Sequence, residues 1–268
     1  MYILHTVHPQ LAPFVDAYWE STFEQMLEPC YDELFVAQLY PNIIVNLSAD
    51  YHRNDERIAS TTLIGINTSP IHFLHQSNNK LFGIRFKPSG LSVFSPFGLH
   101  EIADVSVNLQ DIFGQKGVDL ADKISEAATT ADRIRITEGF LLQHINERFL
   151  DKWRFYQLAQ TELKQLCVEP NAVPLIVKKM NTTQRTFDRH FQQILGLSPK
   201  KISRLLRFQR AFEAMHQQPH FKLNNFNYYA LGYYDQAHFS KEFKEFSGFA
   251  PQVYLASPYF VQNLQAEH

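Results

Sequence analysis

Residues 187–199 have the sequence FDRHFQQILGLSP, and residues 239–251 have the sequence FSKEFKEFSGFAP. The two segments align without a gap, and both have Phe at the first and fifth positions, Gly at the tenth and Pro at the thirteenth. Phe residues four apart lie on one face of a helix. Gly favours the left-handed cap that ends a helix, and Pro favours the first turn of the next one. The sequence therefore predicts one helical unit that occurs twice.

Each copy predicts a helix, a short turn and a second helix with its own N-cap. Thr183 and Asp235 occupy equivalent positions before the second helix, and both residue types are good N-caps. Gly232 lies about three residues before Asp235, which is the spacing of a helix-turn-helix. A generic helical hairpin is the alternative. The side chains opposite the apolar face argue against it, because they suit base edges and phosphates: Arg185, Arg189 and Gln192 in the first copy, and Ala237, Ser240, Lys241 and Lys244 in the second.

The net charge of −2 conceals an asymmetry along the chain. Residues 1–170 carry a net charge of −8, whereas residues 171–268 carry +6. A basic second half favours an anionic partner such as nucleic acid, although a solvated basic surface is the alternative. Lys200, Lys201 and Arg204 begin the helix that we expect between the two units, and they are candidate phosphate contacts. Part of this basic charge could instead pair with the acidic first half.

The first half of the chain predicts strands. Residues 35–51, 61–66 and 80–86 are β-branched and aromatic runs separated by turn residues, as in an antiparallel sandwich or small barrel. Residues 11–19 fit a helix or a strand equally well. From about residue 119 the apolar spacing becomes helical, with Asp132 as a candidate N-cap. The stripe Leu141, Leu142, Ile145 and Phe149 must be buried on its own domain or on a second chain.

Composition and motifs exclude several classes of protein. An apolar fraction of 45% excludes a mainly disordered chain, and two cysteines exclude a disulfide scaffold. The N-terminal residues lack a signal-peptide pattern and no run is apolar enough to span a bilayer, so we expect a cytoplasmic protein and no membrane partner. His72 and His75 would point to opposite faces of a strand, which disfavours a metal site. No nucleophile motif or phosphate-binding loop occurs, so we expect no catalytic residue, cofactor or metal, and no enzyme.

Four motifs carry a resemblance to a known family: GLSPK (196–200), LLRFQRA (205–211), ALGYYDQAHFSKEF (230–243) and GFAP (248–251). They resemble the AraC/XylS family of transcription regulators over about 170–256. The resemblance implies two helix-turn-helix subdomains joined by a long helix at about 199–215. It implies that helices 184–194 and 236–246 each enter a DNA major groove. By family position, the base contacts are Gln184, Arg185, Asp188, Arg189, Gln236, Ala237, Ser240 and Lys241.

The first half resembles the small β-barrel sensor domains of this family more weakly, through PNIIVN (41–46), LIG (63–65) and FGIRFKP (82–88). This resemblance implies an effector or a dimer partner. The expected partners are double-stranded DNA, RNA polymerase, a small-molecule effector and a second copy of the chain.

We therefore expect an α+β protein with a mainly antiparallel, cupin-like β domain and an all-α double helix-turn-helix domain. The expected boundaries are 1–130 for the sensor or dimerisation domain, 131–165 for a helical linker, 166–256 for the DNA-binding domain and 257–268 for a tail. The expected function is a sequence-specific transcription regulator that an effector or partner controls through its first domain. Its expected mode is that of an activator. The alternative is a cupin-like enzyme or small-molecule-binding protein with a helical accessory domain.

Overall fold

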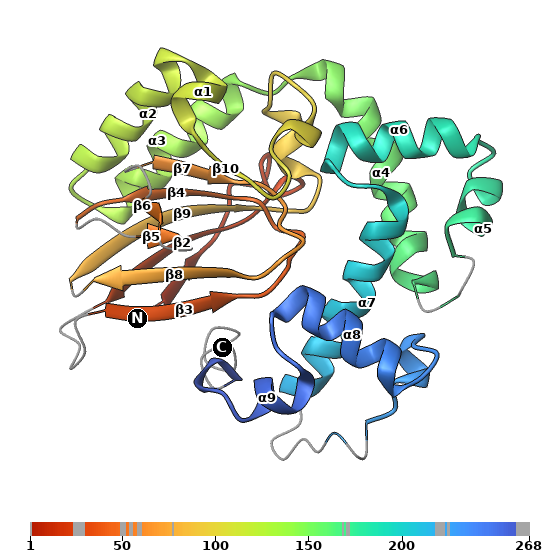
Figure 1. Ribbon diagram of the computed structural model, residues 1–268. Coiled ribbons are helices and arrows are strands. Elements are labelled where there is room, and N and C mark those ends of the chain that lie inside the picture. The colour runs from red at the N-terminus through yellow and green to blue at the C-terminus, as the bar shows by residue number, and fades with distance from the viewer. Residues whose placement is uncertain are drawn as a thin grey trace.

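The computed structural model describes residues 2–23, 30–48, 52–53, 56–57, 61–76, 78–167, 169, 172–217, 223 and 226–260. Two antiparallel sheets form the first part of the chain, helices cover one side of them, and a helical domain follows, as Figure 1 shows. The predicted α+β class is therefore confirmed.

The larger sheet has the strand order β1 (Tyr2–His5), β2 (Val15–Phe23), β9 (Asn79–Phe86), β4 (Asn42–Asn46), β7 (Thr61–Ile64) and β10 (Ser106–Asn108). The smaller sheet has the order β3 (Cys30–Phe35), β8 (Ile71–Gln76), β5 (His52–Arg53) and β6 (Glu56–Arg57). Neighbouring strands are antiparallel throughout. Residues 11–19, which fitted two structures, form a turn followed by the start of β2.

The larger sheet is apolar on both faces, so it is covered on both. One face supplies Tyr18, Phe82 and Ile84 to a core shared with α1 (Leu109–Phe113), α2 (Gln115–Glu126) and α3 (Thr130–Gln143). The other face carries Trp19 and meets the smaller sheet. Gly83 lies beneath Trp19, and a Cβ at this position would stand 2.0 Å from the indole ring. Glycine is therefore required here for the ring to lie on the strand.

The predicted helical stripe belongs to two helices. The chain leaves α3 at His144, and α4 (Glu147–Leu166) begins after the cap Asn146. Leu141 is buried in the core of the β domain, and Leu142 and Ile145 pack against the same core, whereas Phe149 packs against the helical domain. Helical structure also begins earlier than residue 119, at Leu109 of α1.

The expected N-cap at Asp132 is wrong. Thr129 caps α3, because its side chain accepts a hydrogen bond from the backbone N–H of Asp132. Asp132 lies three residues further on, inside the first turn, where its carboxylate accepts a hydrogen bond from the Thr129 hydroxyl. The cap is therefore the Thr129 hydroxyl, three residues before the position that the sequence analysis proposed.

The helical domain consists of α5 (Ala172–Lys179), α6 (Gln184–Leu195), α7 (Pro199–His216), α8 (Gln236–Ser247) and α9 (Pro251–Leu255). Helix α7 is the long connecting helix expected at about 199–215. A short 3-10 helix, η4 (Tyr229–Leu231), precedes the turn at Gly232. Its brevity follows from the Asn- and Tyr-rich segment 226–229, because these residues are poorer helix formers than Ala, Leu or Glu. Among the helices of the described ranges, none has the length and apolar composition that crossing a bilayer requires.

Candidate DNA interface and effector pocket

Helix α6 presents a polar face to solvent. Thr183 caps its start by accepting from the N–H of Thr186, and Gly196, at φ 76°, ends it in the left-handed conformation. Phe187 and Phe191 are fully buried. Opposite them, the exposed side chains are Gln184, Arg185, Arg189 and Gln192, with Asp188 half-buried. The Gln184 amide donates to the Asp188 carboxylate over 2.7 Å, so the acid is held by a glutamine of its own helix.

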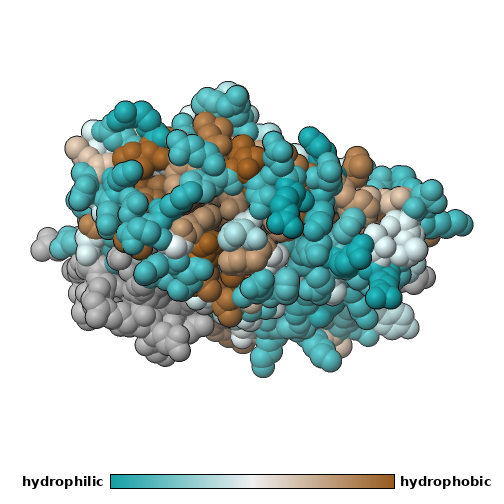
Figure 2. Space-filling view, turned by 90° about the horizontal axis from the view of Figure 1, so that it is seen from above, coloured by the Kyte–Doolittle hydropathy of each residue, from teal (hydrophilic) through white to brown (hydrophobic). Residues whose placement is uncertain are grey.

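Helix α8 has the same construction. Asp235 caps its start by accepting from the N–H of His238, and Gly248, at φ 85°, ends it. Gln236, Ala237 and Lys241 are exposed and Ser240 is half-buried. The eight predicted base contacts therefore lie on the solvent-facing sides of the two capped helices, four on α6 and four on α8. Figure 2 shows mainly hydrophilic side chains over the end of the molecule that α6 covers.

A cluster of arginines and glutamates joins α7 to α8. Glu242 is 1% exposed, and its carboxylate accepts from Arg204 Nε over 2.8 Å and from Arg207 Nε over 3.0 Å. Glu245 accepts from Lys201 Nζ over 2.8 Å and also from Arg204. The hydrogen bonds from Arg204, reinforced by Lys201, lower the pKa of Glu245 to about 2.

This cluster changes the expectation for the phosphate contacts. Lys201 and Arg204 already have carboxylate partners, whereas Lys200 is exposed. Arg204 and Arg207 pair with Glu242 on α8 of the same domain, rather than with the acidic first half as the sequence analysis allowed. The glutamates lie 38 and 44 residues from their partners in sequence, so sequence spacing gave no signal for them.

Sequence analysis missed two exposed tyrosines beside α8. Tyr229 is 63% exposed and Tyr234 is 84% exposed, and both flank the turn before the helix. The Tyr-rich segment was the available signal. His190, in contrast, packs its ring against Phe155 at 4.6 Å, and burial, with Arg189 nearby, lowers its pKa. It therefore serves helix packing.

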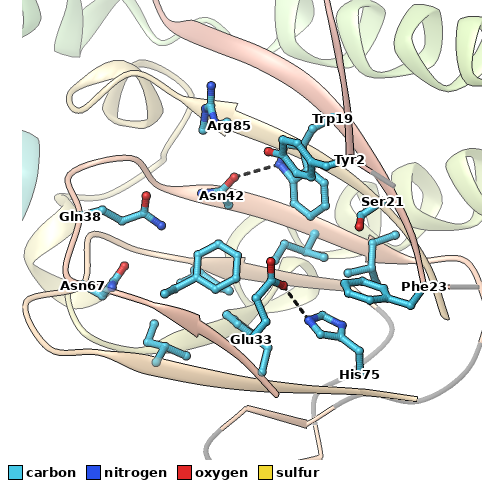
Figure 3. Close-up of a pocket in the computed structure, with 16 residues that line it drawn as sticks. Tyr2, Trp19, Ser21, Phe23, Glu33, Gln38, Asn42, Asn67, His75 and Arg85 are labelled. Atoms are coloured by element: carbon cyan, nitrogen blue, oxygen red, sulfur yellow. Dashed lines mark hydrogen bonds and ion pairs between the residues drawn. The ribbon is translucent and has the colours of Figure 1, made fainter. Parts of the chain in front are cut away.

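A cavity of about 70 Å³ lies between the two sheets of the first domain. Most of its wall is apolar or aromatic, and a few polar groups point into it (Figure 3). The residues that line it are Tyr2, Trp19, Ser21, Phe23, Glu33, Phe35, Gln38, Asn42, Ile44, Ile64, Asn67, Ile71, Phe73, His75, Leu81 and Arg85. This composition is typical of a small-molecule site.

The polar groups of the cavity are already partly paired. His75 Nε2 lies 2.8 Å from Glu33 Oε2, and the His75 side chain is 2% exposed. Arg85 Nε donates to Asp16 over 2.6 Å. Trp19 Nε1 donates to Asn42 over 3.1 Å. Within the described part of the chain, no group of three or more His, Cys, Asp or Glu residues could hold a metal ion.

Residues 176–257 match the family described as a helix-turn-helix domain, over the two units built above. This match confirms the AraC-type helix-turn-helix domain that the sequence motifs predicted. The chain is accordingly a DNA-binding regulator. Residues 5–108 of the regulator match a domain of unknown function, DUF6597. No curated protein matches it by sequence.

Solved structures similar to this chain include those of ToxT from Vibrio cholerae. One is 12% identical, covers 90% of this chain and 98% of its own, and superposes with a TM-score of 0.49. ToxT bound to an unsaturated fatty acid is 13% identical, with coverage of 89% and 94% and a TM-score of 0.46. ToxT bound to (E)-4-(8-methylnaphthalen-1-yl)but-3-enoic acid is 12% identical, with coverage of 90% and 99% and a TM-score of 0.46.

In the regulator, strands β3 and β8 separate the cavity from the second helix-turn-helix unit. Glu33, on β3, points into the cavity, whereas its neighbour Asp32 faces outward and accepts a hydrogen bond from the Tyr259 hydroxyl, beyond α9. His72, on β8, also bonds Asp32 and contacts the Tyr259 ring. His72 and His75 thus lie on opposite faces, as their spacing predicted. We call Asp32, His72 and Tyr259 the docking triad.

The ends of the same strands hold α8 directly. The backbone N–H of Ala37 donates to the carbonyl of Phe246 over 2.9 Å. Gly248, the cap of α8, lies so close to Pro70 that a Cβ would stand 3.1 Å from its ring. The first unit is also held, because α6 packs against the 3-10 helix η2 (Leu99–Glu101). The first domain therefore contacts both DNA-binding units.

Proposed function

We propose that the regulator reads DNA with α6 and α8, each in a major-groove segment. The proposed base contacts are Gln184, Arg185, Asp188, Arg189, Gln236, Ala237, Ser240 and Lys241. Their support is the exposure of these side chains on helices whose opposite faces are buried. Two reading helices in one chain fit two groove segments about one helical turn apart.

We propose Lys200 as the principal phosphate contact of α7, with Lys201 and Arg204 as weaker ones. An exposed ammonium can release DNA counterions without losing an existing partner. Lys201 and Arg204 would have to share their charge with Glu245.

We further propose that a small molecule in the cavity controls DNA binding. The observation that carries this proposal is the shared wall, because β3 and β8 line the cavity on one face and hold the second unit on the other. A ligand that moves Glu33 or His75 would move Asp32 and His72, their neighbours along the same strands. The angle between the two reading helices would then change.

The docking triad provides the test. DNA fragments are first selected from a random pool with the full chain, and the dissociation constant for the best fragment is then measured by fluorescence anisotropy. Asp32→Asn and Tyr259→Phe leave the DNA-facing side chains untouched, yet each should change this constant at least about threefold, since each weakens a hydrogen bond worth roughly 1 kcal/mol. Asp119→Asn, an exposed position on α2, serves as the matched charge control. Unchanged affinity in both triad variants would refute control through this wall.

The other expected partners remain proposals. RNA polymerase contact and action as an activator in the cytoplasm follow from the family resemblance. The stripe that could be buried on its own domain or on a second chain contributes to the core of its own β domain, where Leu141 is 1% exposed. A second copy would have to bind elsewhere, and sedimentation of the full chain at micromolar concentration measures it. Family and fold favour a regulator over the alternative of a β-barrel enzyme.

A further inference from the structure

We propose that the cavity between the sheets selects an organic cation, an amine with an apolar or aromatic body, with Glu33 as the residue that recognises it. This inference rests on the proposed effector control and names the chemical class of the effector. It is carried by the combination of one carboxylate with aromatic walls, as the following contacts show.

The Glu33 carboxylate faces the cavity with one oxygen to spare. Its Oε2 accepts from His75, whereas its other oxygen points toward the middle of the cavity in Figure 3. Among the hydrogen bonds of the described residues, none is recorded for that second oxygen. A half-buried carboxylate oxygen is stabilised by a donor, and a charged donor forms the stronger bond.

The His75 ring has polar neighbours at both of its nitrogens, with Glu33 at Nε2 and Asn79 at Nδ1. The amide nitrogen of Asn79 lies 3.5 Å from His75 Nδ1 and presents only donor hydrogens to it. Glu33 therefore has His75 on one carboxylate oxygen and the cavity on the side of the other.

Arg85 is the positive group that lines the cavity, and its carboxylate partner is Asp16 rather than Glu33. Arg85 is neutralised by Asp16, at 2.6 Å, and its guanidinium also lies over the Tyr40 ring at 5.9 Å. In Figure 3 Arg85 lies across Asn42 from Glu33, toward the opposite end of the cavity. Among the described lining residues, a carboxylate ligand would meet an arginine that already has a carboxylate partner, and it would also meet Glu33.

Aromatic rings complete the site. Tyr2 stacks on Trp19 at 5.5 Å, Phe23 stacks on His75 at 3.9 Å, and Phe35 meets Phe73 edge to face at 5.2 Å. Ring faces attract a desolvated cation, and their apolar area binds its hydrocarbon body. The wall therefore suits an amine better than it suits a polar cation such as a metal ion.

Three probes with one body test the headgroup: phenylbutylamine, phenylbutanol and phenylbutyrate. Their dissociation constants for the full chain are measured by isothermal titration calorimetry at neutral pH. The amine should bind about 10-fold to 100-fold more tightly than the alcohol, which is the range for a charge-assisted hydrogen bond, and more tightly still than the acid. Glu33→Gln should abolish the preference for the amine, whereas Glu126→Gln, an exposed position on α2, should keep it.

The outcomes separate the two proposals. If phenylbutyrate binds as tightly as phenylbutylamine or more tightly, or if phenylbutylamine does not bind, the assignment of an organic cation is overturned. This comparison uses the unaltered chain, so it does not depend on whether a variant folds. If Glu33→Gln folds and keeps the preference, Glu33 is not the recognising group. DNA affinity is measured separately with and without the amine. An amine that binds but leaves DNA affinity unchanged would preserve the ligand class and refute effector control.

Discussion

Glu242 allows the sharpest test of how the second DNA-binding unit is held to α7. The perturbation is Glu242→Gln, which keeps the size of the side chain and removes its charge. Glu242 is 1% exposed, and its carboxylate accepts hydrogen bonds from Arg204 Nε and from both Nε and Nη2 of Arg207. An amide has one acceptor oxygen, and its NH2 group would face the arginine donors. The Arg207 guanidinium would lose its carboxylate partner, whereas Arg204 would keep Glu245.

The expected cost follows from this burial. Removing one partner of a buried ion pair costs about 3–5 kcal/mol, because the remaining charge stays desolvated. For a chain of this size, each kcal/mol lowers the melting temperature by about 2–4 °C, so Glu242→Gln should lower it by roughly 10 °C. The measurement is thermal unfolding of the full chain, followed by circular dichroism of the helices.

Glu245→Gln is the matched control, three residues further along α8. Its carboxylate is 36% exposed, so screening by solvent should limit the cost to about 1 kcal/mol or less. If Glu242→Gln destabilises the chain no more than Glu245→Gln does, the cluster is not a buried anchor and the argument from burial fails.

Three further predictions concern the DNA face, pH and a helix cap. Arg189→Ala should cost about 1–3 kcal/mol of binding free energy on the preferred DNA and relax base choice, whereas Lys200→Ala should weaken binding to all DNA alike and flatten its salt dependence. Anisotropy titrations at several salt concentrations measure both effects. An equal loss of affinity for random DNA would make Arg189 a phosphate contact. The folded pKa of Glu245, about 2, lies below its unfolded value of 4.5. The stability advantage of the unaltered chain over Glu245→Gln, measured by urea unfolding at each pH, should therefore be complete above about pH 4.5 and vanish as the pH falls toward 2. An advantage that grows on acidification would contradict the pairing. Gly196→Ala should destabilise the chain by about 1–2 kcal/mol, since φ is 76° and a Cβ would stand 2.6 Å from the Leu99 carbonyl oxygen, whereas Gly139→Ala, in open space on α3, should be neutral or stabilising in the same unfolding experiment.

Local features of the DNA-binding units were predictable from sequence, because caps act within a few residues. Thr183 and Asp235 cap α6 and α8 as expected, and Gly196 and Gly248 adopt the left-handed conformation. The resemblance placed the long α7 correctly for the same reason, since Pro199 fixes its first turn. Asp132 shows the limit of this reasoning, because Thr129, three residues earlier, is also a residue type that caps helices, and it is the one that does so.

Contacts between distant segments were not predictable. Glu33 and His75 meet only because β3 and β8 pair in one register, and residues 42 positions apart carry no periodic signal. Alternation did predict that His72 and His75 face opposite ways, but not what each would face. The same limit applies to Lys201, whose partner Glu245 comes from the second unit. Residue types thus predicted the two capped helices α6 and α8, whereas the cavity could be seen only in the fold.

If the two proposals hold, the alternation of β3 and β8 makes the proposed ligand preference and the proposed DNA control separately mutable. Glu33, Phe35 and Phe73 can vary with the chemistry of the molecule in the cavity, while Asp32 and His72, one residue away on each strand, keep their contact with Tyr259. A wall two strands wide thus has two independent sets of positions, one for each face. Sensors for new compounds could be made from this chain by randomising the inward set alone and selecting for altered DNA binding.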